Sequence, residues 1–399
     1  MQKRFAPDEG GAFPEWEEVT LGDILEINPK TEEKIADEFY YADLASINNG
    51  VFTHGAAINH NEAPGRAQRV VHIDDVLFQS VNAENLGHYH YTKDKELDKQ
   101  FVASTGFFLL RMKNGCNAFL YQLLFTKAFN QEVHKYSAGS IYPAINITEF
   151  KKIKVRIPKS IEEQRKIAAA LAAYDEMIAV KTAKLETWQE CKKRMVKEIF
   201  DRTKRFKDDN GREFPEWEEK TLREVAEINP ASAESLPETF YYMDLGSIDS
   251  GIWTEKRLID KKSAPSRAQR IAQQDDVFFQ SVRPLNKDHY HYTKKADKSV
   301  VASTGFIQLR IKNGSNAFLY QLLYEDNFNK EVRKYMTGSN YPAINTTSLS
   351  KIKIMVPCME EQQKIGSFLS EIDKEIQIEK EFVKTYAEGK KRMMRELMA

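Results

Sequence analysis

The stretch that decides the fold runs from Ile161 to Phe200 and reads IEEQRKIAAALAAYDEMIAVKTAKLETWQECKKRMVKEIF. Its apolar residues recur in steps of four and three, which is typical of a helix that packs along another helix. Glu162 and Glu163 place negative charge where a helix N-terminus favours it. About forty residues at 1.5 Å each make a rod of roughly 60 Å, which needs a partner helix to bury its seam. The seam residues are Ile167, Leu171, Tyr174, Ile178, Leu185, Trp188, Met195 and Ile199.

A second stretch, Glu360 to Met398, supplies that partner. It repeats the seam position by position, with residues Ile365, Leu369, Ile372, Ile376, Val383, Tyr386, Met393 and Leu397. The polar interruptions recur as well: Glu379 stands where the first stretch has Lys181, and Lys390 stands where it has Lys192. Oppositely charged seam positions near mid-rod suit two helices that pack on each other in one register.

The whole chain, and not only the helix, is duplicated. Residues 13–18, 66–69 and 88–93 return as 214–219, 267–270 and 289–294. Such a long period excludes a solenoid and predicts two domains of one fold, each followed by a rod. The predicted boundaries are 1–158 for the first domain, 159–204 for the first rod, 205–357 for the second domain and 358–399 for the second rod.

Local patterns within a copy predict a mixed α+β domain. Side chains of residues 107–112 alternate between two faces of an extended segment. One face is apolar in both copies, whereas the other carries Gln308 in the second copy, which indicates a half-buried strand. Residues 117–136 carry apolar residues at helical spacing and stop before Gly139, so one helix is predicted there. Residues 153–157 alternate as a final strand that Pro158 closes.

Composition bounds the class of protein. The 399 residues carry a formal net charge of zero, so a nucleic-acid site would have to be local. The three cysteines have neither disulfide nor zinc spacing, which fits a reducing compartment. No apolar signal region opens the chain and no stretch approaches a membrane span. These features predict a soluble cytoplasmic protein without a membrane partner.

No catalytic motif is visible. Asn28-Pro29-Lys30 lacks the second proline and the aromatic residue of an amino-methyltransferase loop, and no phosphate-binding glycine loop occurs. A nuclease trio of Asp8, Glu32 and Lys34 is not kept in the second copy. The sequence therefore predicts no catalytic residue and no cofactor.

A metal site is weighed at His88 and His90, which share one face of a strand. No carboxylate or cysteine stands at fitting spacing in both copies, so packing among aromatic residues is the favoured role and no metal is predicted.

Binding residues gather in repeated polar loops, whose side chains are of the types that contact phosphates and base edges. The alternative is a merely solvated surface, but the repetition of whole loops favours binding. In the first copy the candidates are Arg66, Gln68, Arg69, Gln79, Ser80, Asn82, His88, Tyr89, His90, Lys93, Lys135, Ser140 and Tyr142. In the second copy they are Arg267, Gln269, Arg270, Gln280, Ser281, Arg283, His289, Tyr290, His291, Lys294, Lys334, Ser339 and Tyr341.

The order of domain, long helix, domain, long helix resembles the specificity subunit of Type I restriction–modification systems. The likeness covers essentially the whole chain. The motifs that carry it are Phe13 to Trp16 with Leu21 and Ile27, Ser104 to Phe107, Gly139-Ser140 with Asn146, and the helix starts at Glu163 and Glu361.

The resemblance implies that each domain is a target-recognition domain that reads one half of a split double-stranded DNA sequence. It implies that the rods form an antiparallel coiled coil that relates the domains by a pseudo-twofold axis. The coil would act as a ruler and dock two modification (methyltransferase) subunits, and restriction subunits would join for cleavage. S-adenosylmethionine, ATP and magnesium would belong to those partners. One departure is that the two domains are unusually similar to each other.

Similar domains facing opposite ways predict an interrupted, near-palindromic target with halves about one helical turn apart. Asn82 and Arg283 differ at equivalent positions, and asparagine favours adenine while arginine favours guanine. One half-site is therefore expected to carry A where the other carries G. Two alternatives are a coiled-coil adaptor presenting two protein-binding domains and a degenerate nuclease acting alone.

Overall fold

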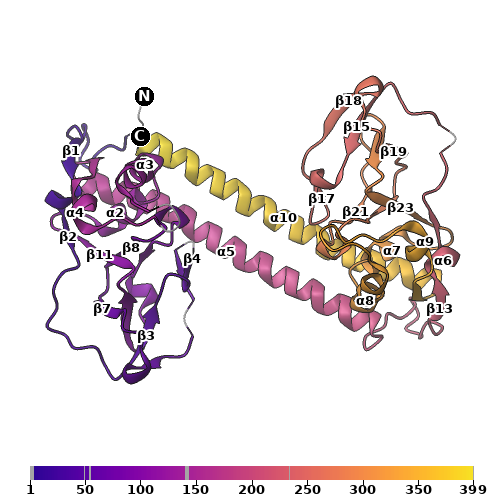
Figure 1. Cartoon of the computed structure of the whole chain (residues 1–399), viewed down its shortest axis with the longest axis horizontal. Helices are drawn as coiled ribbons and strands as arrows, with labels where there is room; N and C mark the ends of the chain where they lie inside the picture. The colour runs from indigo at the N-terminus through magenta and orange to yellow at the C-terminus, as the bar shows by residue number, and fades with distance from the viewer. Residues whose placement is uncertain (1–3, 49, 54, 140–142, 233, 399) are drawn as a thin grey trace. The chain divides into compact units, whose positions relative to one another are not determined.

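The computed structural model describes residues 4–48, 50–53, 55–139, 143–232 and 234–398. The chain divides into two compact units, 1–181 with 382–399, and 182–381 (Figure 1). Each unit therefore contains one globular domain and one half of each long helix.

The two rods are the helices α5 (Ile161–Phe200) and α10 (Met359–Leu397). In the first unit the start of α5 contacts the end of α10, where the rings of Tyr174 and Tyr386 lie 6.4 Å apart. In the second unit the end of α5 contacts the start of α10, where Lys192 pairs with Asp373 at 2.6 Å. Pairing is thus antiparallel within each unit, as expected. Every predicted seam residue of both helices is buried or half-buried, which confirms the two apolar stripes.

The polar seam positions also make contacts between the two helices. Glu379 pairs with Lys184 at 2.6 Å, and the Lys181 ammonium lies 4.1 Å from the centre of the Phe382 ring. Near the start of α5 the apolar stripe packs on the globular domain, since Ile167 and Leu171 belong to the core of the first domain.

The first domain contains two four-stranded sheets. One has the order β2-β11-β8-β9 and is antiparallel; the other has the order β6-β3-β10-β7, in which β3 and β10 are parallel. The strands of the first sheet are Leu25–Ile27, Phe107–Met112, Val76–Gln79 and Tyr89–His90. Those of the second are Ile58–Asn59, Glu38–Ala42, Gln100–Ser104 and Ala67–Val71. Two small sheets pair β1 (Glu17–Thr20) with β12 (Lys154–Ile157) and β4 (Ile47–Asn48) with β5 (Val51–Phe52).

The helices of this domain are short. They are α1 (Leu21–Ile24), α2 (Asn117–Leu123), α3 (Lys127–Tyr136) and α4 (Ile147–Lys152), with the 3-10 turns η1 (His60–Glu62), η2 (Ala83–Asn85) and η3 (Lys93–Lys95). The single helix predicted over 117–136 is wrong, because the chain breaks between α2 and α3. The Thr126 hydroxyl caps α3 by accepting from the Phe129 amide, and the Asn130 side chain donates to the Leu124 carbonyl.

The second domain repeats this architecture, with sheets β14-β23-β20-β21 and β18-β15-β22-β19 and the small pairs β13-β24 and β16-β17. This confirms that one fold occurs twice. The strands of the large sheets are Ala226–Ile228, Phe306–Ile311, Val277–Gln280, Tyr290–His291, Arg257–Asp260, Thr239–Met243, Val300–Ser303 and Ala268–Ile271. The small pairs are Glu218–Thr221 with Lys353–Val356 and Ile248–Asp249 with Ile252–Trp253. The helices are α6 (Leu222–Val225), α7 (Asn316–Leu322), α8 (Asp326–Tyr335) and α9 (Thr346–Ser350), with η4 (Leu245–Ser247), η5 (Lys261–Ser263) and η6 (Pro284–Asn286).

Strand β11 separates two cores. Phe108 and Leu110 join the core shared with the helices, while Phe107 and Leu109 join the core shared with the second sheet. The prediction of a half-buried strand is therefore wrong, since both faces are covered. The second copy tolerates Gln308 there because its buried side-chain amide donates to the Asp276 carboxylate at 2.7 Å.

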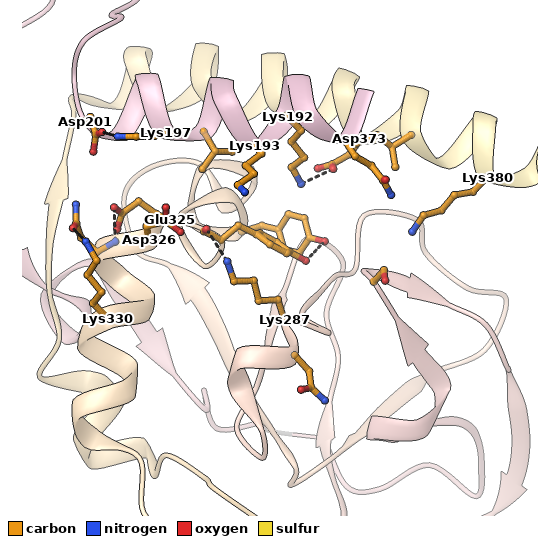
Figure 2. A pocket seen from close by; sticks show the side chains of 18 residues that line it. Lys192, Lys193, Lys197, Asp201, Lys287, Glu325, Asp326, Lys330, Asp373 and Lys380 are labelled. Atoms are coloured by element: carbon orange, nitrogen blue, oxygen red, sulfur yellow. Dashed lines mark hydrogen bonds and ion pairs between the residues drawn. The ribbon is translucent and has the colours of Figure 1, made fainter. Parts of the chain in front are cut away.

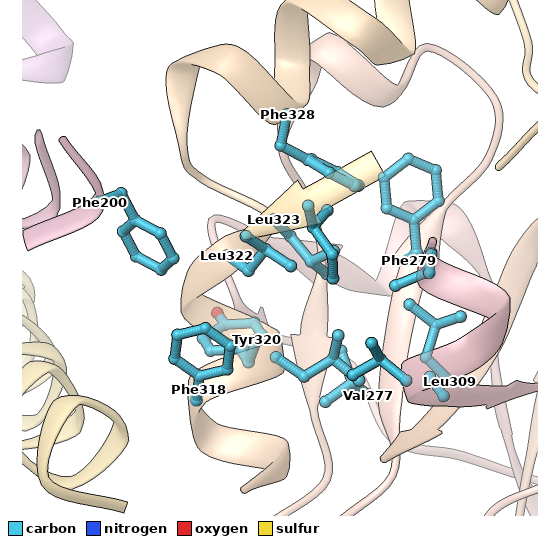
Figure 3. Close-up of a cluster of buried hydrophobic side chains, with 14 of the residues drawn as sticks. Phe200, Val277, Phe279, Leu309, Phe318, Tyr320, Leu322, Leu323 and Phe328 are labelled. Carbon is cyan, nitrogen blue, oxygen red and sulfur yellow. The ribbon is translucent and has the colours of Figure 1, made fainter. Parts of the chain in front are cut away.

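Each domain is joined firmly to the long helix that follows it in sequence. In the second unit, the buried Glu361 carboxylate at the start of α10 accepts two hydrogen bonds from Arg205 and one from Trp217. The end of α5 packs on the same domain, where the Phe200 and Phe318 rings stack with centroids 5.6 Å apart (Figure 3). Glu163, Arg4 and Trp16 repeat the polar joint in the first unit.

Candidate nucleic-acid interface

Four segments of the second domain are joined by backbone hydrogen bonds into one surface. The Thr304 amide donates to the Arg267 carbonyl at 2.8 Å, and the Ser281 amide donates to the Gly305 carbonyl at 3.0 Å. The Arg283 amide then donates to the Pro342 carbonyl at 2.7 Å. We call the segments 265–269, 281–283, 304–305 and 337–343 the second loop surface.

The first domain repeats this arrangement. Thr105 bonds to Arg66 at 3.0 Å, Ser80 bonds to Gly106 at 2.9 Å, and Asn82 bonds to Pro143 at 2.7 Å, in each case from amide to carbonyl. The first loop surface is therefore formed by 64–68, 80–82, 105–106 and the described part of 137–144. The predicted residues Ser140 and Tyr142 lie outside the described residues.

Exposed polar side chains stand at matching places on both loop surfaces. Arg66 and Arg267 are exposed, and so are Gln68 and Gln269. Each glutamine amide donates to a backbone carbonyl three residues earlier at 2.7 Å, which fixes its direction while the rest of the side chain faces solvent.

Arg69 and Arg270 follow directly and are half-buried, opposite Ala103 and Ala302 of the neighbouring strands. Their Nε atoms are buried, and within the described part of the chain neither atom has a hydrogen-bond partner. Burial lowers the pKa of both guanidinium groups from the ordinary value, and no carboxylate of the described residues opposes this effect. A partly desolvated cation without an acid is a favourable place for an anion.

Arg111 and Arg310 show the contrast. Each lies on a central strand and contacts a buried aspartate, Asp75 or Asp276, so its charge is balanced internally. Arg69 and Arg270 differ from them, because no such acid lies beside either one in the part of the chain that the structure describes.

Asn82 and Arg283 occupy the same backbone position in the two copies. Both residues have a left-handed backbone conformation, with φ of 50° and 52°, and both directly precede a 3-10 turn. The exposed Arg283 guanidinium lies 4.7 Å from the centre of the Tyr341 ring and donates to the Asn340 carbonyl at 3.4 Å. Tyr341 itself is 69% exposed. The sequence reasoning missed Asn340, whose only signal was its position beside Tyr341.

Gln79, Ser80 and their equivalents Gln280 and Ser281 are buried. The Gln79 side-chain oxygen accepts from the Gly87 amide at 3.0 Å, and its amide donates to the Val81 carbonyl at 2.7 Å. Both serine hydroxyls donate to the carbonyl of the facing glycine. These side chains therefore hold the loops together, and the direct DNA contacts expected of them stay a prediction.

The histidines and tyrosines predicted as contacts at 88–90 and 289–291 are buried or half-buried in the domains. His88 and His289 are fully buried and stack on Phe78 and Phe279, with ring centroids 4.7 Å apart. The Nδ1 atom of each histidine accepts a hydrogen bond at 3.1 Å from a backbone amide of the same domain, that of Gln79 or Gln280. Burial lowers the pKa of both to about 3, so they are neutral. His90 and His291 bond to the aspartates Asp74 and Asp275 at 2.7 Å, and Tyr89 and Tyr290 pack beside the smaller cores. This placement fits packing rather than contact with DNA.

The predicted lysines are exposed, but three of them have acidic neighbours. Lys93, Lys135 and Lys334 pair with glutamates three residues away, which weakens their local field. Lys294 and Ser339 are exposed. Among the described residues, no group of three or more His, Cys, Asp or Glu side chains could hold a metal ion. No described helix is both long and apolar enough to cross a membrane.

Comparisons with known proteins agree with this picture. The family described as Type I restriction modification DNA specificity domain matches twice, over residues 14–187 and 215–384. The Type I restriction enzyme MjaVIII specificity subunit of Methanocaldococcus jannaschii is 25% identical over 419 residues, covering 100% of this chain and 95% of that protein. The Type I restriction enzyme HindI specificity subunit of Haemophilus influenzae is 24% identical over 193 residues, covering 47% and 41%. The crystal structure of a Type I restriction–modification S subunit from M. genitalium has a TM-score of 0.63 at 16% identity over 96% of each chain, a likeness of fold.

Proposed function

Since the chain belongs to the family of Type I restriction–modification DNA specificity proteins, we propose that it reads a bipartite double-stranded DNA target through its two loop surfaces. Residues 1–158 and 205–357 act as the target-recognition domains, one for each half-site. The parts 159–204 and 358–399 form the antiparallel coiled coil that sets the spacing between them.

The observation that carries this proposal is the unpartnered arginine beside each loop surface. Arg69 and Arg270 are partly desolvated and lack an acid among the described residues, so a DNA phosphate would supply the missing negative charge. Arg66 and Arg267 stand three residues earlier and are exposed, so they would add positive charge on the side of the loop surface that faces the duplex. Phosphate contacts of this kind fix the orientation of a domain on DNA without reading sequence.

The DNA sequence is then read by exposed side chains of the loop surfaces, next to the arginines that bind phosphate. Asn82 in the first domain and Arg283 in the second are the clearest difference between the loop surfaces. Asparagine pairs with adenine and arginine with guanine in the major groove, each with about 1–3 kcal/mol of discrimination for a good bidentate pair. The target is therefore a near-palindrome whose halves differ at the base that these residues meet.

The chain acts without catalysis of its own. Two modification subunits dock on the coiled coil and carry out methylation, and restriction subunits join for cleavage, all in the cytoplasm. The relatives' names as specificity subunits of restriction enzymes support this division of labour. A coiled-coil adaptor that binds only proteins is the alternative.

Fluorescence anisotropy with fragments of host DNA tests the proposal, with the chain alone and with its co-purified methyltransferase. Specific, salt-dependent binding is expected, and it should weaken when Arg69 and Arg270 are both changed to alanine. Absence of DNA binding under every condition, with the methyltransferase still bound, would favour the adaptor.

A further inference from the structure

A cavity of about 510 Å³ lies within the second unit, between the second half of α5, the facing part of α10 and the helices α7 and α8 (Figure 2). This volume is in the range of small-molecule sites, which is about 300–1,000 Å³. Its lining contains more cations than anions. The cations are Lys192, Lys193, Lys197, Lys287, Lys330 and Lys380, and the anions are Asp201, Glu325, Asp326 and Asp373.

The acidic groups of the lining are already engaged. Asp373 accepts from Lys192 at 2.6 Å and from the Gln321 amide at 2.7 Å, and Asp201 pairs with Lys197. Glu325 caps α8 by accepting the amides of residues 327 and 328. Asp326 lies in the first turn of α8, where the helix dipole favours negative charge.

Four lysines are left without a carboxylate partner among the described residues. Lys287 donates to the Tyr324 carbonyl at 3.4 Å, and Lys330 donates to the Asn327 side-chain oxygen at 3.2 Å. Lys193, Lys287 and Lys380 extend into the space between the helices and the domain (Figure 2). Bringing several ammonium groups together costs free energy unless a counter-anion joins them.

The fold does not require these charges, because the first copy lacks three of them. Lys287 follows η6 in the left-handed conformation, as Leu86 follows η2. Lys330 is the fifth residue of α8, as Gln131 is of α3. Lys380 stands fifteen residues after the seam residue Ile365, as Thr182 stands after Ile167.

We propose that this cavity binds a multiply charged phosphate group. Lysine is a common phosphate ligand because its ammonium is a compact point charge with three donors. Two sources share this chemistry: a free polyphosphate, or the backbone of DNA held by this domain, and the second source rests on the proposed function. The two sources differ in whether DNA is needed, so one experiment with two arms separates them.

The first arm titrates inorganic triphosphate into the full-length protein by isothermal calorimetry. We expect saturable binding to one site, and at least a tenfold loss of affinity in the variant with Lys287→Leu, Lys330→Gln and Lys380→Thr. That variant carries the residues of the first copy, which favours correct folding. The matched control changes Lys207, Lys220 and Lys351 to alanine, three exposed lysines outside the cavity, and should bind triphosphate as the unaltered chain does.

The second arm measures DNA affinity against salt with the same proteins. If the phosphate comes from DNA, the cavity variant reduces the magnitude of the log–log salt slope by up to about three, and triphosphate competes with DNA for the protein. If it is a free anion, the slope stays that of the control while triphosphate binding is lost. The inference is overturned if the unaltered protein does not bind triphosphate at millimolar concentration and the cavity variant leaves the slope unchanged. Failure of the unaltered protein to bind DNA would overturn only the proposed function, because the first arm needs no DNA.

Discussion

The guanidinium of Arg283 lies over the ring of Tyr341, 4.7 Å from its centre, at the position where the first domain carries Asn82. Stacking on an exposed ring restricts the arginine before DNA arrives, and its five donors keep a fixed fork geometry. The pair thus presents a prepared contact on the second loop surface.

Changing Arg283 to asparagine should make the two half-sites more alike. The expected effect is loss of a guanine preference at one position of the second half-site, by about 1–3 kcal/mol, with the first half-site unchanged. Selection of bound duplexes from a randomised pool, followed by sequencing, measures this. Tyr341→Leu is the companion variant, which should weaken the same preference without removing it. An unaltered preference in Arg283→Asn would mean that this residue touches only phosphate or solvent.

Replacing Arg69 or Arg270 with alanine should weaken binding to every DNA sequence about equally. Each change should lower the magnitude of the log–log salt slope by about one, because one phosphate contact is lost. Salt titrations of DNA affinity give both quantities. Lys154→Ala is a suitable control, since that exposed lysine already pairs with Glu18 at 3.0 Å. Slopes that match the control would assign the two arginines to packing alone.

Arg205→Ala should destabilise the second unit strongly. It leaves the buried Glu361 carboxylate without its charge partner, and breaking a buried pair in this way costs about 3–5 kcal/mol. Lys353→Ala breaks the exposed pair with Glu219 and should cost no more than about 1 kcal/mol. Urea unfolding followed by tryptophan fluorescence compares them, because Trp217 donates to the same Glu361. Equal unfolding midpoints for the two variants would show that the Arg205–Glu361 pair does not hold the second domain to α10.

Acid should destabilise the chain partly through His88 and His289. Their folded pKa of about 3 lies below the ordinary value of 6.5, so the unfolded state binds more protons between those values. The stabilisation that the two neutral histidines contribute is therefore fully present above about pH 6.5. As the pH drops toward 3, the free energy of unfolding falls by up to about 1.4 kcal/mol per pH unit for each histidine. The His289→Gln variant should show a shallower decline between pH 6 and 4.5 than the unaltered chain in denaturant unfolding. An identical decline would show that His289 does not contribute to it.

The sequence predicted the parts of the fold that depend on periodicity and repetition. The seam from Ile167 to Met195 and its copy in α10 were visible because heptad spacing reports burial directly. The break at Thr126 was missed, since its capping hydroxyl interrupts a pattern that otherwise continues through α2 and α3.

The site was predicted less well, because residue type does not reveal burial. Gln79 and His88 have the polar groups of a DNA-binding loop, yet they bond to backbone inside the domain. Arg69 looked like its neighbour Arg66, and only strand pairing with Ala103 shows that it is half-buried. Which loops meet depends on long-range contacts such as that between Asn82 and Pro143, which no local pattern encodes.

Single-molecule sequencing of methylated DNA from the host, with this chain as the only active specificity subunit, tests most directly whether the chain reads a bipartite target. One methylated motif is expected, made of two related short sequences on opposite strands whose centres lie about one helical turn apart. The motif should disappear when the gene for this chain is deleted. Two unrelated half-sites, or methylation that persists without the chain, would contradict this expectation.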